Sequence, residues 1–257
     1  MSGWPKPVRL PFRERSKEPM RLEGFADAVL GFAVTLAVVS LDVPRTSGDL
    51  LLLARGVPSF AITFTILVGI WHGHHRFSRR YGLDDEVTIV WTAVLLFVAV
   101  FYTYPLKFLM AATFDPFFGA PTQVMDAGGH LVDVMQREHV GLVMALYGVG
   151  YGLVNAAFWA LHRHAWRLRE TLGLDGSEQL ETRLVMRNYR DAGLFASVFV
   201  FLWPVMMIPR GPGRVAGLLV YLAVMIGSML VFIRGVNAGK RERERWLASR
   251  AAAGEAR

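Results

Sequence analysis

The sequence contains no cysteine. This absence excludes disulfide frameworks, thiolate metal sites and cysteine nucleophiles as the basis of its function. Charge is also scarce, because Asp, Glu, Lys and Arg make up 19% of the 257 residues, against 53% for hydrophobic residues. A mean hydropathy of +0.35 is too high for an ordinary water-soluble domain. We therefore expect a lipid bilayer to be part of its surroundings.

The apolar residues are gathered into long segments. A helix of about 20 residues is needed to cross a hydrocarbon core of about 30 Å. Six segments meet this requirement, at residues 24–43, 51–72, 87–111, 140–161, 192–209 and 213–233. The sequence therefore predicts an all-α, multi-pass protein of the cell membrane with six transmembrane helices.

Basic residues are distributed unevenly between these segments. Most of the 28 Lys and Arg residues lie before the first segment, after the second, between the fourth and fifth, and after the last. By the positive-inside rule these four stretches face the cytoplasm, so both termini are predicted to be cytoplasmic. Because the net charge of +7 is dispersed over four stretches beside a bilayer, we expect no nucleic-acid partner.

The chain is expected to hold one membrane domain with two short flanking pieces. Residues 1–23 form a predicted cytoplasmic N-terminal segment, residues 24–233 the transmembrane domain, and residues 234–257 a basic cytoplasmic tail. The first twenty residues contain prolines and no apolar run, so they are not expected to be a signal peptide. The alternating charges from Lys240 to Arg245 favour a solvated helical extension, and contact with lipid headgroups is the alternative.

The first apolar segment carries a carboxylate, Asp27, about one helical turn from its start. A charge at that depth is costly unless it is paired or hydrogen-bonded. Arg21 and Arg76 are candidate cations at the same end, and Trp71 and His75 are candidate hydrogen-bond donors. Two interpretations remain open, namely a structural clasp between the first and second segments, or a site for a proton or another ion.

A different face of the first segment carries a continuous stripe. Its members, spaced by alternate intervals of four and three, are Ala28, Phe32, Thr35, Val39 and Asp42. Asp27 is rotated by about 100° from this stripe. The spacing fits ordinary helix packing, and it also fits a pore lining. In a pore, Phe32 would form an apolar constriction and Asp42 a cation-attracting outer mouth.

Three motifs in this part of the chain resemble those of a known family. Arg21-x-x-x-Phe25-Ala26-Asp27 is similar to the Arg-x-x-x-Phe-Ser-Asp signature of the bacterial relatives of the endolysosomal transmembrane protein 175 potassium channel. The segment from Trp71 to Arg76 is similar to the Trp-x-x-His-His-Arg motif of that family, and Tyr104-Pro105-Leu106 resembles its next segment. Ala26 stands where the signature has serine.

The resemblance implies a potassium-favouring monovalent cation channel with passive conduction. It implies a homotetramer of six-helix subunits around a central pore, with the lipid bilayer and other copies of the chain as partners. It assigns the hydrophobic gate to Phe32, in place of an aliphatic residue, and further pore-lining positions to Thr35 and Val39. Beside the pore, the predicted structural clasp between the first and second segments consists of Arg21, Phe25, Asp27, Trp71, His75 and Arg76. No enzymatic activity and no cofactor are expected, with potassium as the permeant ion.

A second potassium-channel signal lies at Tyr147–Gly152, which contains Val-Gly-Tyr-Gly, the core of the ordinary potassium filter. It lies in the middle of an apolar segment and lacks the usual leading threonine, so a filter is disfavoured. Small residues recur here at intervals of four or three, namely Gly141, Ala145, Gly148, Gly152 and Ala156. This pattern is typical of close helix packing.

Two functions of other classes are the alternatives. One is a membrane metal-binding protein, because histidines gather at the predicted cytoplasmic ends of the second and fourth segments, namely His72, His74, His75, His162 and His164. The other is a proton-coupled secondary transporter that uses Asp27 and a histidine as a relay. Such transporters often show inverted repeats, and we find none in the sequence.

Overall fold

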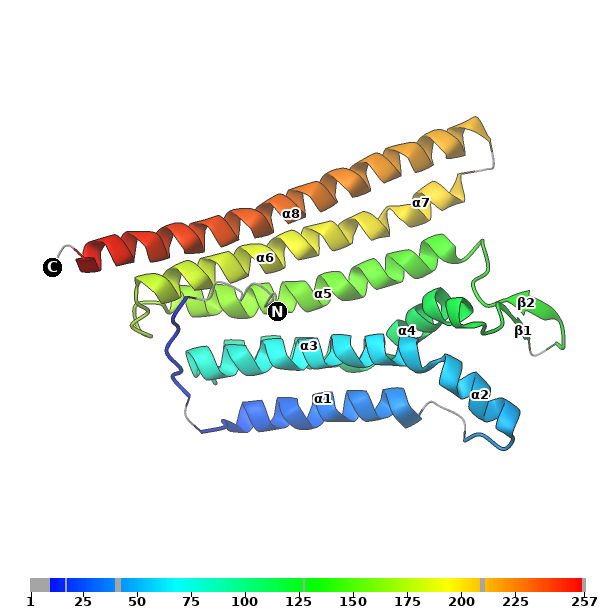
Figure 1. Cartoon of the computed structure of the whole chain (residues 1–257), viewed down its shortest axis with the longest axis horizontal. Helices are drawn as coiled ribbons and strands as arrows, with labels where there is room; N and C mark the ends of the chain where they lie inside the picture. The colour runs from blue at the N-terminus through cyan, green and yellow to red at the C-terminus, as the bar shows by residue number, and fades with distance from the viewer. Residues whose placement is uncertain (1–9, 17, 40–42, 127, 209–210, 256–257) are drawn as a thin grey trace.

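Long helices that lie side by side make up most of the computed structural model, which describes residues 10–16, 18–39, 43–126, 128–208 and 211–255 (Figure 1). The long helices are α1 (Arg21–Val39), α3 (Val57–Tyr81), α4 (Glu86–Phe114), α5 (Val140–Arg167), α6 (Gly176–Val200) and α8 (Pro212–Glu255). The shorter elements are α2 (Ser47–Arg55), the 3-10 helix η1 (Asp115–Phe118), α7 (Leu202–Met207) and an antiparallel hairpin of β1 (Gln123–Met125) and β2 (Leu131–Asp133).

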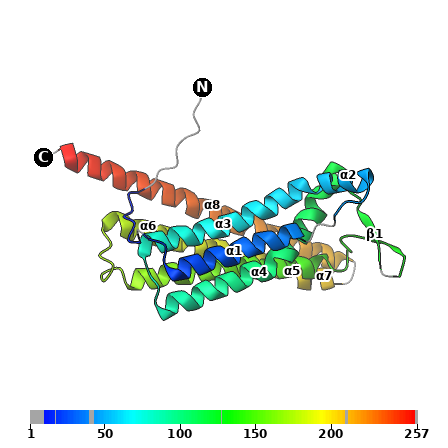
Figure 2. The ribbon, with the colours of Figure 1, turned by 90° about the horizontal axis from the view of Figure 1, so that it is seen from below.

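The helices pack in a row that begins with a group of three. Helix α1 lies against both α3 and α4, α4 packs on α5, α5 on α6, and α6 on α8 (Figures 1 and 2). One end of the bundle holds residues 10–16, the end of α3 and the start of α6, and α8 extends beyond the other helices there (Figure 2). Helix α2 and the hairpin lie at the opposite end. The first end carries the basic stretches that the sequence predicts to be cytoplasmic.

Three described helical stretches are long and apolar enough to cross a membrane, at Glu86–Phe118, Val140–Arg167 and Val215–Ala252. Helices α2 and α3, bent by 47° at the break between them, give a fourth if they are counted as one span. The other two predicted segments correspond to α1 and to the combination of α6 and α7. The predicted fifth segment is interrupted, because α6 ends at Val200 and α7 begins at Leu202.

Helix α8 continues without a break from the last predicted segment into the basic tail. Two ion pairs hold this continuation against α6, one between Arg187 and Glu242 at 3.0 Å and one between Glu181 and Arg243 at 2.8 Å. The alternating charges of the tail therefore lie on a helical extension that is partly packed, and α8 runs through residue 234.

The filter-like sequence is an uninterrupted part of α5. Glycine is required at two of its positions by close neighbours. A Cβ at Gly148 would lie 2.8 Å from the carbonyl oxygen of Ala196 on α6, and a Cβ at Gly150 would overlap the ring of Tyr102 on α4. The Tyr102 hydroxyl donates a hydrogen bond of 2.7 Å to the carbonyl of Leu146. The glycines thus serve helix packing within the subunit.

Candidate functional site

Helix α1 has one buried face and one exposed face. The buried residues, Glu23, Ala26, Leu30, Ala33 and Ala37, recur at intervals of three and four. This is the period of a single helical face, and it lies against α3 and α4. Four of the five side chains are apolar and three are alanines, so α1 approaches its neighbours closely. The packing fixes which side of the helix remains free of its own chain.

The predicted pore-lining stripe lies on the exposed side. Ala28 and Thr35 are exposed, and Phe32 exposes 56% of its surface. The Thr35 hydroxyl donates a hydrogen bond of 2.9 Å to the carbonyl of Gly31, which satisfies its proton within the helix and leaves its oxygen accessible. Val39 ends α1, but its side chain and all of Asp42 lie outside the described residues.

A ladder of two polar contacts joins α1 to α3. The indole Nε1 of Trp71 donates a hydrogen bond of 2.8 Å to Oδ1 of Asp27. One turn away, Nδ1 of His75 lies 2.9 Å from Oε1 of Glu23. The Trp71 and His75 rings stack with centroids 5.4 Å apart. Glu23 and Asp27 are four residues apart on α1, and Trp71 and His75 are four residues apart on α3, so each helix presents its two groups on one face. The two helices are antiparallel, and the facing groups therefore form two successive contacts.

The remaining residues of the predicted clasp lie elsewhere. Arg21 and Phe25 are exposed, and Arg76 lines a small cavity between α3, α5 and α6. Among the described residues, neither arginine forms a hydrogen bond or ion pair with Asp27. Sequence reasoning missed Glu23, which is 2% exposed. Its position four residues before Asp27, opposite a histidine four residues after Trp71, is the signal that would have found it.

The histidines of the metal-site alternative take part in separate contacts. Nε2 of His74 lies 3.2 Å from the Thr92 hydroxyl, and Nδ1 of His162 lies 2.8 Å from the carbonyl of Phe158. His164 pairs with Asp85, the N-cap of α4, at 2.8 Å. Within the described part of the chain, no three His, Cys, Asp or Glu side chains form a group that could hold a metal ion.

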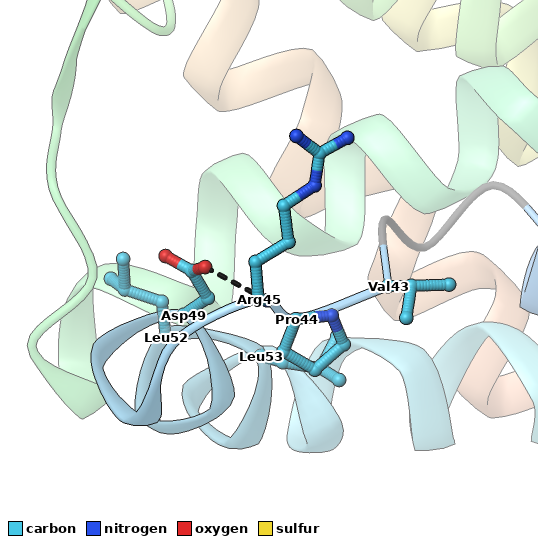
Figure 3. Close-up of a pocket in the computed structure, with 6 residues that line it drawn as sticks. All are labelled: Val43, Pro44, Arg45, Asp49, Leu52 and Leu53. Atoms are coloured by element: carbon cyan, nitrogen blue, oxygen red, sulfur yellow. Dashed lines mark hydrogen bonds between the residues drawn. The ribbon is translucent and has the colours of Figure 1, made fainter.

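At the other end of α1, an open pocket of about 670 Å³ surrounds the connection to α2. Figure 3 shows its lining residues Val43, Pro44, Arg45, Asp49, Leu52 and Leu53. Asp49 accepts hydrogen bonds of 3.0 Å from the backbone N–H groups of Arg45 and Thr46, and so caps α2. The pocket presents charges of both signs at the end where the sequence predicts the outer mouth.

Comparisons with known proteins agree with one another. The family model described as endosomal/lysosomal potassium channel TMEM175 matches residues 21–102. A potassium channel from Marivirga tractuosa is 34% identical over 172 residues, which are 67% of this chain and 69% of that protein. A potassium channel from Chamaesiphon minutus is 29% identical over 107 residues, which are 38% of this chain and 53% of that protein.

A solved structure is similar over nearly the whole chain. It is the crystal structure of the potassium channel MtTMEM175, a threonine-to-alanine variant in complex with a nanobody-MBP fusion protein. The two folds match with a TM-score of 0.68 at 30% identity, covering 87% of this chain and 95% of the other.

Proposed function

Because this chain belongs to the TMEM175 family of potassium channels, we propose that it conducts potassium passively through a pore lined by α1 of each subunit. The chain is accordingly a multi-pass membrane protein and an ion channel rather than an enzyme. We place it in the cell membrane as a homotetramer, with six spans per subunit and both termini in the cytoplasm. Potassium is its permeant ion, with other monovalent cations less favoured, and no cofactor takes part.

The exposed stripe of α1 is the observation that carries this proposal. One helix cannot enclose an aqueous path, so a pore lined by α1 requires several copies of the chain around an axis. The buried alanine face holds α1 on its own subunit, while Ala28, Phe32 and Thr35 face away from it. Four such stripes would form an apolar ring at Phe32 and a hydroxyl ring at Thr35, with Val39 next and Asp42 at the outer mouth.

The ladder between α1 and α3 supports this arrangement because it holds α1 in one orientation on its own subunit. Its two rungs resist rotation of α1 about its own axis, because any rotation separates Glu23 from His75 and Asp27 from Trp71 together. The ladder therefore supports a pore in which Phe32 keeps one orientation. We assign Arg21 and Phe25, both exposed in the single subunit, to the completion of this clasp in the tetramer.

Potassium flux from liposomes that contain the purified protein tests the proposal. The wild type is compared with Thr35→Ala at a fixed potassium gradient, and valinomycin measures the potassium available for release. Passive flux that changes with Thr35→Ala is expected, because the substitution removes the hydroxyl ring. Accumulation of potassium against its gradient when a proton gradient is imposed would instead establish the transporter alternative.

A further inference from the structure

A small cavity of about 40 Å³ lies between α3, α5 and α6 at the end of the bundle assigned to the cytoplasm. Its polar lining comes from Arg76 and Arg80 on α3, His162 on α5 and Tyr189 on α6. The volume exceeds the minimum of about 10–15 Å³ that a single water molecule requires. Neither the proposed pore nor the ladder between α1 and α3 uses this cavity.

Gly73 lines one side of the cavity, and its lack of a side chain lets the helices approach closely there. A Cβ at this position would lie 2.9 Å from Cζ of Phe158 and 3.4 Å from the hydroxyl oxygen of Tyr189. The Phe158 and Tyr189 rings stack with centroids 4.8 Å apart. Helix α3 thus approaches α5 and α6 closely enough for the Tyr189 hydroxyl to reach the same space as the arginines.

Positive charge is in surplus around this cavity. Two carboxylates at this end of the bundle already have close partners, since Arg15 binds Glu178 at 2.6 Å and Arg243 binds Glu181 at 2.8 Å. Arg80 lies 3.8 Å from Glu181, with its guanidinium 4.6 Å from the Phe12 ring centroid.

Arg76 contributes a second charge to this surplus. In the portion of the chain that the structure covers, it makes no hydrogen bond or ion pair. A partly buried guanidinium without a partner favours binding of an anion, and guanidinium groups bind phosphate oxygens in a bidentate manner.

The cavity lies at the depth of lipid headgroups in the proposed membrane arrangement. Arg76 follows the predicted span 51–72, His162 follows the span 140–161, and Tyr189 precedes the span 192–209. Nearby guanidinium groups lie over indole rings, with Arg163 5.0 Å from Trp159 and Arg183 5.4 Å from Trp166. Tryptophan with arginine is typical of the membrane interface, where anionic lipids present their phosphates.

We propose that this cavity binds the phosphate group of an anionic lipid headgroup. Arg76 is the principal ligand, Arg80 supplies a second positive charge, and the Tyr189 hydroxyl donates a hydrogen bond. This site is separate from the pore and depends on the proposed function only through the membrane arrangement. Binding of lipid therefore succeeds or fails independently of conduction.

The test measures thermal unfolding of the purified full-length protein in uncharged detergent, titrated with dioctanoyl phosphatidylglycerol. Dioctanoyl phosphatidylcholine, which has a phosphate but no net charge, and inorganic phosphate are titrated in parallel. We expect the wild type to be stabilised by phosphatidylglycerol well above the other two. The variant Arg76→Gln should weaken this binding by about tenfold or more, because it loses a charge-assisted bond to phosphate.

Arg163→Gln is the matched control, because Arg163 is an exposed arginine at the same end that does not line the cavity. It should bind phosphatidylglycerol like the wild type. Tyr189→Phe preserves the packing and should weaken binding severalfold, which keeps the test informative if Arg76→Gln folds poorly. Equal losses in the Arg76 and Arg163 variants, or equal responses to both lipids, would overturn the proposal. Stabilisation by inorganic phosphate without a lipid preference would overturn the lipid source.

Discussion

Arg15 and Glu178, which lie 163 residues apart in sequence, form a bidentate pair with Nη2–Oε2 at 2.6 Å and Nη1–Oε1 at 3.1 Å. Glu178 is fully buried at the start of α6 and also accepts a hydrogen bond of 2.8 Å from the backbone N–H of Arg13. The Arg15 guanidinium donates further bonds to the carbonyls of Leu172 and Arg80. The N-terminal strap, residues 10–16, is thus fastened to the α5–α6 connection and to α3.

Glu178→Gln is expected to destabilise the protein by about 3 kcal/mol, because it leaves the Arg15 guanidinium, whose side chain is 13% exposed, without its opposite charge. Thermal or denaturant unfolding in detergent measures the change. Glu170→Gln is the control, since the Arg169–Glu170 pair is exposed and its loss should change stability by about 1 kcal/mol or less. Similar stabilities for the two variants would show that the strap is only loosely attached.

The same pair makes stability depend on acid. Burial alone would raise the pKa of Glu178, but bonds from the Arg15 side chain and the Arg13 and Asp175 backbone outweigh it and hold the pKa below its ordinary value of 4.5. A carboxyl group with a lowered folded-state pKa stabilises the fold fully above the unfolded value, and this contribution is lost as the pH falls through the folded value. Unfolding of wild type and Glu178→Gln measured between pH 7 and pH 3 should therefore show a difference in stability that shrinks below about pH 4.5. A difference independent of pH would contradict the assignment.

Phe32→Ala should increase potassium flux through the proposed pore, because four smaller side chains widen the apolar constriction and ease its wetting. Liposome flux, normalised to the amount of reconstituted protein, measures this effect. Phe97→Ala removes an equally large ring that is 70% exposed on α4, and it should leave flux unchanged. An unchanged current in the Phe32 variant would reject the gate assignment.

Asp27→Asn should reduce the yield of assembled protein more than it changes ion selectivity, because Asp27 acts as a hydrogen-bond acceptor for Trp71 in the ladder. Size-exclusion chromatography and flux with potassium or sodium separate the two effects. Trp71→Phe, which removes the indole donor but keeps an aromatic ring, should produce the same loss of assembly. A well-assembled Asp27→Asn protein with altered proton dependence would favour the ion-site interpretation.

Gly150→Ala should lower the folded yield strongly, because a Cβ at this position overlaps the Tyr102 ring. Gly152→Ala is the control within the same motif, since its Cβ would lie 3.8 Å from that of Ala196, an ordinary contact distance. The double variant Gly150→Ala with Tyr102→Ala should recover part of the lost yield. A folded Gly150→Ala protein with lost potassium selectivity would revive the filter interpretation.

Sequence patterns predicted the long helices and the pairing of Asp27 with Trp71, because apolar periodicity and the cost of a charge in lipid are both local signals. The predicted span 192–209 divides at Phe201, and the tail after residue 233 belongs to α8. Local apolarity does not reveal where a helix is interrupted, or whether a polar segment continues the helix before it.

Contacts between residues far apart in the sequence could not be predicted from local patterns. Glu23 lies within the predicted N-terminal segment, so its burial depends on where α3 lies. Arg76 was expected beside Asp27 and lies instead in the cavity with Arg80 and Tyr189. The strap, with Arg15 held by Glu178, gave no periodic signal because residues 10–16 form no helix or strand.

The strap also sets a limit on movement at the start of α1. The backbone N–H groups of Arg15 and Ser16 donate to the carbonyl of Arg79, near the end of α3, at 3.0 and 3.3 Å. Only five peptide units separate Ser16 from Arg21, the first residue of α1, and a fully extended chain of that length spans at most about 18 Å. While the strap stays bound, it acts as a tether of fixed radius. Opening of the proposed pore must therefore keep the start of α1 within that distance of Ser16.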